Sequence, residues 1–267
     1  MVLASPFMPR SFDASPLEVS NWLLNLAGVR MSVRGQERIP QDIPLVVISN
    51  HRSFMDAPLL MHAVKRPVRF ACHHYMGQVP GLREVVNALG FMPLDKPDSG
   101  QTAFFRKALQ ALGDNQAIGI FPEGAAPMVS KTDPRSLERF HRGFAYLATR
   151  APVDEVAVVP VAIASHSETN NSVVPLRLLS LFDPTEPLFQ QPGWHPAVVY
   201  RDVELLIGHP VKVDARLRSH YDGKGVSTLV TGLSHEPLTQ DNAFHNLTKF
   251  SAPHRMIYLA AQRGYDV

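Results

Sequence analysis

The sequence predicts a single layered α/β domain with a mixed, mostly parallel sheet flanked by helices. Short apolar runs recur along the chain, and amphipathic patterns separate them. The runs are LVVIS (45–49), PVRFA (67–71), AIGIF (117–121), AVVPVAIA (157–164) and VVYRDVELLIG (198–208). Strands that alternate with helices build a sheet whose faces are covered by the helices. No internal repeat, low-complexity tract or shift in composition divides the chain, so we expect one domain.

Helical periodicity appears between these runs. The predicted helices span residues 16–28, 56–64, 100–113 and 136–150. In the first of them, Val19, Trp22, Leu23 and Leu26 share one face at spacings of three and four. That face either packs on the domain or lies on a membrane surface with Trp22 at the interface. The sequence leaves both alternatives open.

The second half of the chain has weaker patterns. Residues 182–196 hold four prolines and are expected to form a loop. The run 198–208 has the character of a late edge or mixed strand. Beyond Asp214 only a short helix, at residues 254–262, is suggested by the apolar spacing.

Composition excludes several classes of protein. The 26 basic and 24 acidic residues give a net charge of +2, which is unlike the strong basic excess of nucleic-acid-binding proteins. The single cysteine allows no internal disulfide and fits a reducing compartment. No window of about 18 residues is apolar and free of charge, so we expect no transmembrane helix. The first 16 residues lack the apolar centre of a signal peptide, so we expect no signal peptide.

The stretch NHRSFMD (50–56) follows the first apolar run directly. His51 and Asp56 would lie roughly 140° apart in one regular helix, so they can meet only if the chain turns between them. Pro58 favours a helix that begins near Asp56. A carboxylate that accepts the Nδ1 hydrogen would leave the other ring nitrogen free to act as a general base. The alternative is that Asp56 caps the helix and His51 is a loop histidine without a function.

The stretch FPEG (121–124) follows the apolar run that ends at Ile120. A turn explains the proline and the glycine but gives no reason for Glu123. Ligands of α/β sheets bind at the carboxyl ends of strands, where this carboxylate is expected. The triplet of Cys72, His73 and His74 has the residue types of a metal site, but adjacent histidines in a strand point in different directions, so we expect no metal.

Four ordered blocks together resemble the glycerolipid (lysophospholipid) acyltransferase superfamily of the 1-acyl-sn-glycerol-3-phosphate acyltransferase type. They are NHRSFMD (50–56), ALGFMPLDK (88–96), FPEG (121–124) and VPVAI (159–163). The resemblance spans about residues 33–163, with VELLIGHPV (203–211) as a closing strand. It implies a glycerol-3-phosphate acyltransferase-like fold with an N-terminal helical segment (1–32), an acyltransferase domain (33–214) and a C-terminal extension (215–267).

The resemblance also implies a mechanism. His51 would act as the general base on an acceptor hydroxyl, and Asp56 would orient it. The donor would be acyl-CoA or acyl-carrier protein, a co-substrate rather than a cofactor, and no other cofactor is expected. The first expected acceptor is 1-acyl-sn-glycerol-3-phosphate, which would give phosphatidate on the cytoplasmic side of a membrane to which the protein binds peripherally. No Gly-x-Ser-x-Gly elbow is present, so a serine nucleophile is not expected.

The resemblance places a set of residues at the substrate. They are Asn50, Ser53, Lys96, Phe121, Pro122, Glu123, Gly124 and Arg142. Two departures concern the acceptor: the third block usually continues Glu-Gly-Thr-Arg, but Ala125 and Ala126 stand here, and Lys96 replaces an arginine and so lacks its bidentate fork. Other cations could supply the missing charge or simply form a solvated face: Arg106, Lys107, Lys131, Arg135, Arg139 and Arg142.

These departures leave alternatives open. The acceptor could be another lyso-lipid or a neutral alcohol. A different class of function is a catalytically silent acyl- or lipid-binding protein on the same fold. A third is a thioester hydrolase in which His51 activates water.

Overall fold

The computed structural model describes residues 14–94, 102–124, 141, 143–179, 181 and 194–221. The strands are β1 (Arg30–Arg34), β2 (Leu45–Ser49), β3 (Val68–Cys72), β4 (Met92–Pro93), β5 (Ala117–Ile120), β6 (Glu155–Pro175), β7 (Trp194–Ile207) and β8 (Val211–Asp214). The α-helices are α1 (Pro16–Leu26), α2 (Asp56–Val64), α3 (Leu82–Ala88), α4 (Thr102–Gly113), α6 (Gly143–Arg150), α7 (Leu176–Leu179) and α8 (Ala215–Tyr221).

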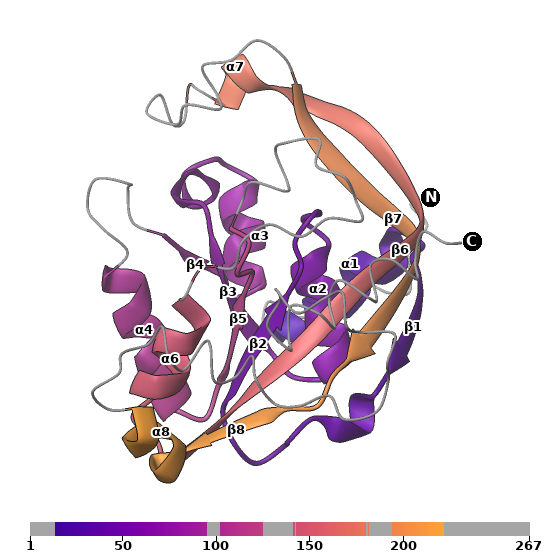
Figure 1. Ribbon diagram of the computed structural model, residues 1–267. Helices are drawn as coiled ribbons and strands as arrows, with labels where there is room; N and C mark the ends of the chain where they lie inside the picture. The colour runs from indigo at the N-terminus through magenta and orange to yellow at the C-terminus, as the bar shows by residue number, and fades with distance from the viewer. Residues whose placement is uncertain are drawn as a thin grey trace.

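One mixed sheet forms the centre of the molecule, in the order β1-β7-β6-β2-β5-β3-β4, with β8 beside β6 (Figure 1). Strands β2, β3, β4 and β5 and the first part of β6 run parallel to their neighbours on this path. Strand β7 pairs antiparallel with β6 and parallel with β1, which makes the sheet mixed. The predicted α/β fold with a mostly parallel sheet is therefore confirmed.

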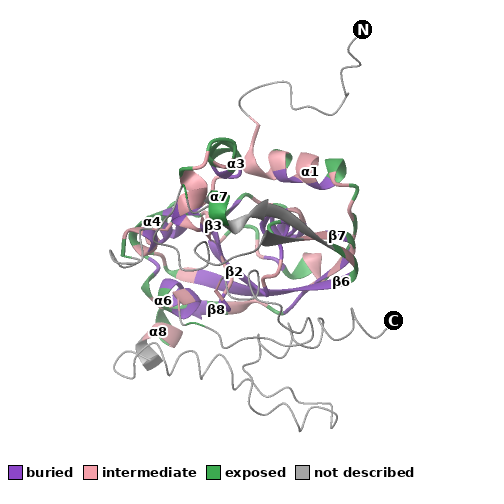
Figure 2. Cartoon of the chain, turned by 90° about the horizontal axis from the view of Figure 1, so that it is seen from above, coloured by how far each residue is buried: buried purple, intermediate pink, exposed green. Residues whose placement is uncertain are grey.

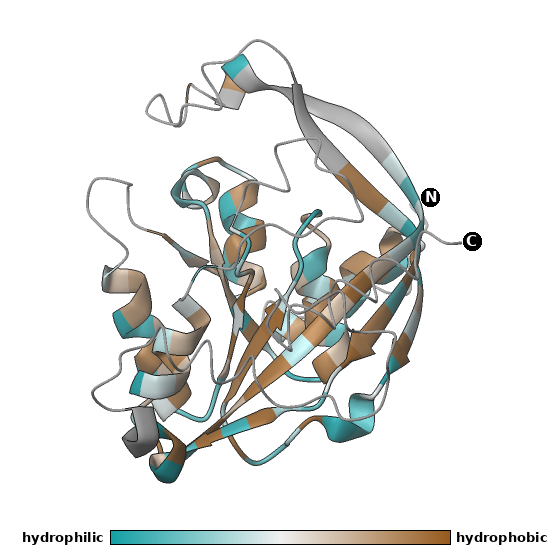
Figure 3. Ribbon diagram, in the orientation of Figure 1, coloured by the Kyte–Doolittle hydropathy of each residue, from teal (hydrophilic) through white to brown (hydrophobic). Residues whose placement is uncertain are grey.

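Strand β2 shows why an unbroken apolar run was needed at the centre. All five of its residues are buried. Leu45 and Val47 join the apolar cluster that includes α1 and α2, whereas Val46 and Ile48 join the cluster that includes α4 and α6. Because helices cover both faces, the four successive side chains from Leu45 to Ile48 are all apolar, and the buried polar Ser49 ends the strand. Figure 3 shows the same pattern as a hydrophobic band through the central strands.

Helix α1 packs on the domain, which was one of the two expected alternatives. Leu24 is 1% exposed, and the hydroxyl of the fully buried Ser20 lies 3.2 Å from the sulfur of Met61 on α2. Asn21 and His62 join the two helices through a side-chain hydrogen bond of 2.8 Å. Figure 2 shows the buried side of α1 turned toward the rest of the domain. Within the described residues, no helix combines the length and the apolar character that crossing a membrane requires.

The β6–β7 hairpin is the largest departure from the predicted elements. The run 157–164 belongs to a strand that begins at Glu155 and continues to Pro175. Figure 1 shows β6 and β7 extending beyond the neighbouring strands toward α7. The prediction of an edge position for 198–208 is wrong, because β7 lies between β1 and β6; its mixed pairing is confirmed. The apolar run contained no information on strand order, so the partner β1 was missed.

Several other predicted elements lie partly or wholly outside the described residues. The loop predicted for 182–196 lies outside them up to residue 193, and residues 194–196 open β7. Helix α6 begins at Gly143, so the earlier part of the helix predicted for 136–150 is outside them, apart from His141. The helix suggested at 254–262 is also outside. Helices α3 and α8 were not predicted because each is only seven residues long.

Candidate active site

The two sequence stretches that carry polar residues lie at the same edge of the sheet. Strand β2 pairs in parallel with β5, with Ile48 opposite Ile120. The loop 50–56 therefore leaves β2 beside the turn 121–124 that leaves β5. The carboxyl ends of neighbouring parallel strands are the usual place for a ligand in an α/β sheet.

Asn50 fixes the point at which the chain leaves β2. Its amide nitrogen donates to the carbonyl of Ile163 at 2.9 Å, and its amide oxygen accepts from the N–H of Ile163 at 2.8 Å. These bonds continue the β2–β6 ladder by one step through a side chain, so the main chain is free to turn away. Asn50 is 4% exposed, and its predicted contact with substrate stays a prediction.

The side chains of His51 and Asp56 meet. Nδ1 of His51 lies 2.9 Å from Oδ2 of Asp56, which also accepts the main-chain N–H groups of Arg52 at 2.7 Å and Ser53 at 2.8 Å. Three donors on one oxygen stabilise the charged carboxylate although Asp56 is fully buried. The arrangement makes Nδ1 the protonated nitrogen of the neutral ring. Nε2 has no hydrogen-bond partner in the part of the chain that the structure describes.

Asp56 does not cap the helix that follows it. Helix α2 begins at Asp56 itself, and Met55 occupies the N-cap position without a side-chain bond. Both N–H groups that the carboxylate accepts precede the helix, so the capping alternative is wrong. The negative charge still lies at the amino end of α2, where the helix dipole favours it.

Phe121 stacks on the ring of His51. The two ring centroids are 3.8 Å apart with an interplanar angle of 10°, and the ring of Phe70 stacks in turn on Phe121 at 5.2 Å. Gly119 makes room for this column, because a Cβ there would come within 2.0 Å of the Phe70 ring. The stack and the Asp56 contact together leave the His51 ring with one orientation.

Glu123 enters the site from the β5 turn. Its Oε1 accepts the main-chain N–H of His51 at 3.3 Å, and Glu123 is only 4% exposed. The turn closes through the N–H of Gly124, which donates to the carbonyl of Phe121 at 3.0 Å. Gly124 has φ of 74°, a conformation that favours glycine. The glycine of FPEG thus has a backbone role, and the glutamate holds the loop that carries His51.

The β6–β7 hairpin supports the same loop from the other side. The guanidinium of Arg52 forms a bidentate ion pair with Glu168 of β6, at 3.2 and 3.3 Å. The hydroxyl of Ser53 donates to the carbonyl of Val198 on β7 at 2.5 Å. Ser53 is 1% exposed, and its predicted substrate contact stays a prediction. Sequence reasoning missed Glu168 and Val198, since neither belongs to a recognisable motif.

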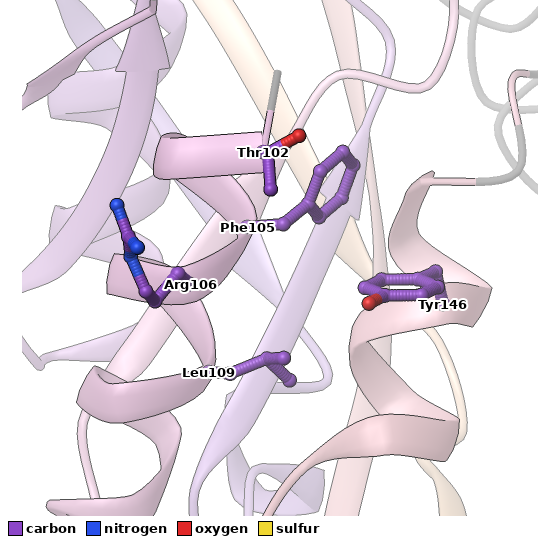
Figure 4. Close-up of a pocket in the computed structure, with 5 residues that line it drawn as sticks. All are labelled: Thr102, Phe105, Arg106, Leu109 and Tyr146. Carbon is purple, nitrogen blue, oxygen red and sulfur yellow. The ribbon is translucent and has the colours of Figure 1, made fainter. Parts of the chain in front are cut away.

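A separate cavity of about 440 Å³ lies between α4 and α6 (Figure 4). Its lining consists of Thr102, Phe105, Arg106, Leu109 and Tyr146. The rings of Phe105 and Tyr146 meet edge to face at 5.1 Å. Arg106, one of the alternative cations, therefore borders an aromatic cavity, and neither His51 nor Asp56 lines it.

Two residues of the predicted substrate site, Lys96 and Arg142, lie outside the described residues, and so do Ala125 and Ala126, where the third block departs from the family pattern. Pro122 is buried in the β5 turn, and its carbonyl accepts the N–H of His141 at 2.7 Å. Within the described ranges, no group of three or more His, Cys, Asp or Glu side chains is arranged to hold a metal ion. The rings of His73 and His74 lie 5.0 Å apart at the end of β3.

Comparison with known proteins decides the family. The family model described as Acyltransferase matches residues 30–164, just over half of the 267 residues. The chain belongs to this acyltransferase family. The match contains the loop 50–56, the turn 121–124 and Ile163. The contacts of His51 with Asp56, Phe121 and Glu123 therefore all lie within the matched region. Glu168 and Val198 lie beyond it.

The individual relatives share less than 30% sequence identity with this chain. Human 1-acyl-sn-glycerol-3-phosphate acyltransferase beta is 29% identical over 148 residues, which are 54% of this chain and 50% of the relative. The 1-acyl-sn-glycerol-3-phosphate acyltransferase of Borreliella burgdorferi is 27% identical over 109 residues, 40% of this chain and 42% of the relative. The chain thus spans about half the length of the curated relatives it matches. The crystal structure of PlsC, the 1-acyl-sn-glycerophosphate acyltransferase from Thermotoga maritima, aligns with a TM-score of 0.46 and 21% identity over 84% of each chain.

Proposed function

We propose that this acyltransferase-family chain moves a fatty acyl group from a thioester to a hydroxyl of a lipid acceptor. The observation that carries the proposal is the pairing of His51 Nδ1 with Asp56 at 2.9 Å, with Nε2 left unpartnered among the described residues. A histidine held in this way has its free nitrogen ready to take a proton. The donor is acyl-CoA or acyl-carrier protein.

The proposed step conserves every atom. Nε2 of His51 takes the proton of the acceptor hydroxyl while the oxygen attacks the thioester carbonyl. The tetrahedral intermediate collapses, the C–S bond breaks, and the imidazolium returns its proton to the departing thiolate. The products are an ester and a free thiol. Because a thioester is already activated, positioning and base catalysis are sufficient contributions from the protein.

The buried surroundings support this assignment. Asp56 carries its charge beside the ring and stabilises the imidazolium that forms during the step. Phe121 prevents the ring from turning, and Glu123 holds the main chain of His51. Each of these contacts is intramolecular, so the base is oriented before substrate arrives, which lowers the entropic cost of reaction.

The proposed acceptor is 1-acyl-sn-glycerol-3-phosphate, and the product is phosphatidate. The names of the curated relatives support this choice, although they share only about half their length with the chain. A lipid acceptor and an acyl chain also place the reaction at a membrane surface, which we propose the protein binds peripherally on the cytoplasmic side. Ala125 and Ala126 make a test with several acceptors necessary.

The test is acyl transfer by purified protein with acyl-CoA or acyl-carrier protein. The acceptors are 1-acyl-sn-glycerol-3-phosphate, a lyso-lipid with a choline head group and a long-chain alcohol. We expect transfer to the first, and His51→Ala to lower kcat by about 10²- to 10⁴-fold. The matched control is His209→Ala, which removes an exposed histidine between β7 and β8 and should leave kcat unchanged.

Three outcomes would contradict the proposal. Acyl transfer that survives in His51→Ala would show that His51 is not the general base. Tight acyl binding without transfer to any acceptor favours a silent binding protein. Free fatty acid released without any acceptor favours a hydrolase. Preference for another head group or for the alcohol would change the acceptor while leaving the chemistry of His51 in place.

A further inference from the structure

We infer that Glu168 is a positioning residue that acts through Arg52 on the part of the loop 50–56 that orients the carboxylate of Asp56. This inference deepens the proposed function and rests on it for its catalytic meaning. Glu168 lies on β6, beyond residue 164, where the match to the family model ends. No sequence motif marks it, so only the contacts in the folded chain point to this role.

Arg52 and Ser53 each make two kinds of contact, one through the main chain and one through the side chain. Their main-chain N–H groups donate to Oδ2 of Asp56 at 2.7 and 2.8 Å. The guanidinium of Arg52 binds both carboxylate oxygens of Glu168 at 3.2 and 3.3 Å. The hydroxyl of Ser53 donates to the carbonyl of Val198 at 2.5 Å. The two residues that hold the carboxylate of Asp56 are therefore the two that the β6–β7 hairpin holds.

This part of the loop needs anchors because it has no regular structure of its own. Residues 50–53 form neither helix nor strand, and α2 begins only at Asp56. Oδ2 of Asp56 also meets Nδ1 of His51 at 2.9 Å, so a shift of its two N–H donors would move this oxygen relative to the ring. A misplacement of about 1 Å can lower a rate by about 10²-fold. Only Arg52 and Asp56 lie between Glu168 and the proposed base.

The shape of β6 explains how Glu168 comes to meet the loop. The pairing of β6 with β7 shifts register between Ser165 and Ser167, and again between Ser167 and Glu168. Irregularities of this kind bend a strand and change the direction of the side chains that follow. Farther along β6, Asn170 pairs with Val198 of β7. Glu168 and Val198 thus reach the loop from two neighbouring strands.

The shielding of the ion pair indicates that it can fix the orientation of Arg52. The side chains of Arg52 and Glu168 are 16% and 15% exposed, whereas those of the surface pair Arg30 and Asp202 are 78% and 40% exposed. Exposed pairs contribute little, but a shielded bidentate pair fixes both the position and the plane of the guanidinium. Glutamine at position 168 would keep one acceptor oxygen and lose the charge. The guanidinium would then keep one of its two bonds to residue 168.

The first experiment follows the main-chain amide hydrogen exchange of Arg52 and Ser53 by NMR, without substrate, in the wild type and in Glu168→Gln. We expect both amides to exchange faster by about fivefold or more in the variant. The amides of β2 should keep their rates, because they report on opening of the whole sheet. The matched control is Glu155→Gln, which removes the ion pair with Lys212 at 3.1 Å from the first residue of the same strand. It should leave the exchange of both loop amides unchanged.

The second experiment measures acyl transfer by the same variants. In Glu168→Gln we expect kcat to fall by about five- to tenfold, with KM for the acyl donor unchanged, because Glu168 orients the base and does not bind the donor. Glu155→Gln should retain full kcat. The double variant Arg52→Gln/Glu168→Gln should lose no more activity than Arg52→Gln alone, since Glu168 acts only through Arg52.

Unchanged exchange of the two loop amides, or an equal acceleration in β2 or in Glu155→Gln, would overturn the inference. So would an unchanged kcat in Glu168→Gln, or losses in the double variant that simply add. If Glu168→Gln does not fold, exchange in the double variant decides instead, because no shielded guanidinium is then left without its partner. The exchange needs no substrate. If the wild type transfers no acyl group, the proposed function fails, and the exchange still decides whether Glu168 positions the loop.

Discussion

Two buried carboxylates approach His51 from adjacent strands, and they act on different parts of it. Asp56, in the loop after β2, contacts the imidazole ring and two main-chain N–H groups of its own loop. Glu123, in the turn after β5, contacts the main-chain N–H of His51 across 72 residues of sequence. The first carboxylate acts on the reacting group, whereas the second acts on the segment that carries it.

This difference explains why the two stretches carry unequal information. The contacts of Asp56 are local, so a spacing of five residues and a turn are sufficient to describe them. The contact of Glu123 exists only because β2 and β5 are neighbours in the sheet. The two carboxylates should therefore differ in what their loss does: the chemistry in one case, and the position of the loop in the other.

The largest expected effect is that of Asp56→Asn. The amide cannot fix the ring as the carboxylate does and cannot stabilise an imidazolium, so kcat should fall by about 10²- to 10⁴-fold. Acyl transfer under saturating substrate measures this. Asp202→Asn, which breaks the exposed ion pair with Arg30, is the control and should retain full kcat. A kcat within a few-fold of the wild type in Asp56→Asn would mean that Asp56, like Glu123, only positions the loop and does not take part in the chemistry.

Glu123→Gln should have a smaller effect. The glutamine keeps an oxygen to accept the N–H of His51 but loses the charge, and hydrogen bonds to charged groups are stronger than neutral ones by about 1 kcal/mol. We expect kcat/KM to fall by about fivefold, without a change in the pH of the acidic limb. If that limb moves as it does in an Asp56 variant, Glu123 acts on the ring after all and the comparison fails.

The sequence was sufficient for the parts of the site that depend on local order. The run LVVIS fixed β2, and Pro58 placed the start of α2 at Asp56, where the structure has it. The four-block resemblance anticipated the family. These features are encoded within a few residues of one another, so one sequence reveals them.

What the sequence did not reveal depends on strand order. Glu168 and Val198 reach the loop because β6 continues to Pro175 and pairs antiparallel with β7. Neither the length of β6 nor the position of β7 inside the sheet follows from apolar periodicity, which reports burial and not partners. Phe121 was expected at the substrate, and its stack on His51 requires Gly119 to admit Phe70, a contact between two strands.

Phe121→Leu tests the ring stack on His51. Leucine preserves most of the apolar volume but loses the ring contact, which is worth about 0.5–1.5 kcal/mol. We expect kcat to fall by about three- to tenfold. The matched control is Phe91→Leu, which removes the edge contact of Phe91 with Phe70 at 5.9 Å, one ring farther from His51. A larger loss in Phe91→Leu than in Phe121→Leu would show that packing of the column, rather than the His51 contact, is what matters.

The last comparison concerns stability and not activity. Cys72 carries a buried thiol, a weak acid, near the same edge of the sheet as the two carboxylates. Strand β3 ends at Cys72, which is 8% exposed, and burial raises the pKa of its thiol to about 12 from 9.0. Among the residues that the structure describes, no hydrogen-bond donor to the sulfur offsets the cost of charging it, whereas three donors meet the carboxylate of Asp56. The folded state therefore holds the proton more strongly than the unfolded state does, and the thiol stabilises the fold fully only below about pH 9.

This stabilisation should be lost as the pH rises from about 9 toward 12, and about 2 kcal/mol of it should be lost by roughly pH 10.5. Urea unfolding of the wild type and of Cys72→Ala at a series of pH values measures it, because all other ionisations are common to both proteins. Their difference in free energy of unfolding should stay constant below pH 9 and then change in favour of the variant. Parallel curves throughout would mean that the thiolate is as well solvated as in the unfolded chain. In that case burial without donors would carry no cost for Cys72, and the three donors would not be what distinguishes Asp56 from it.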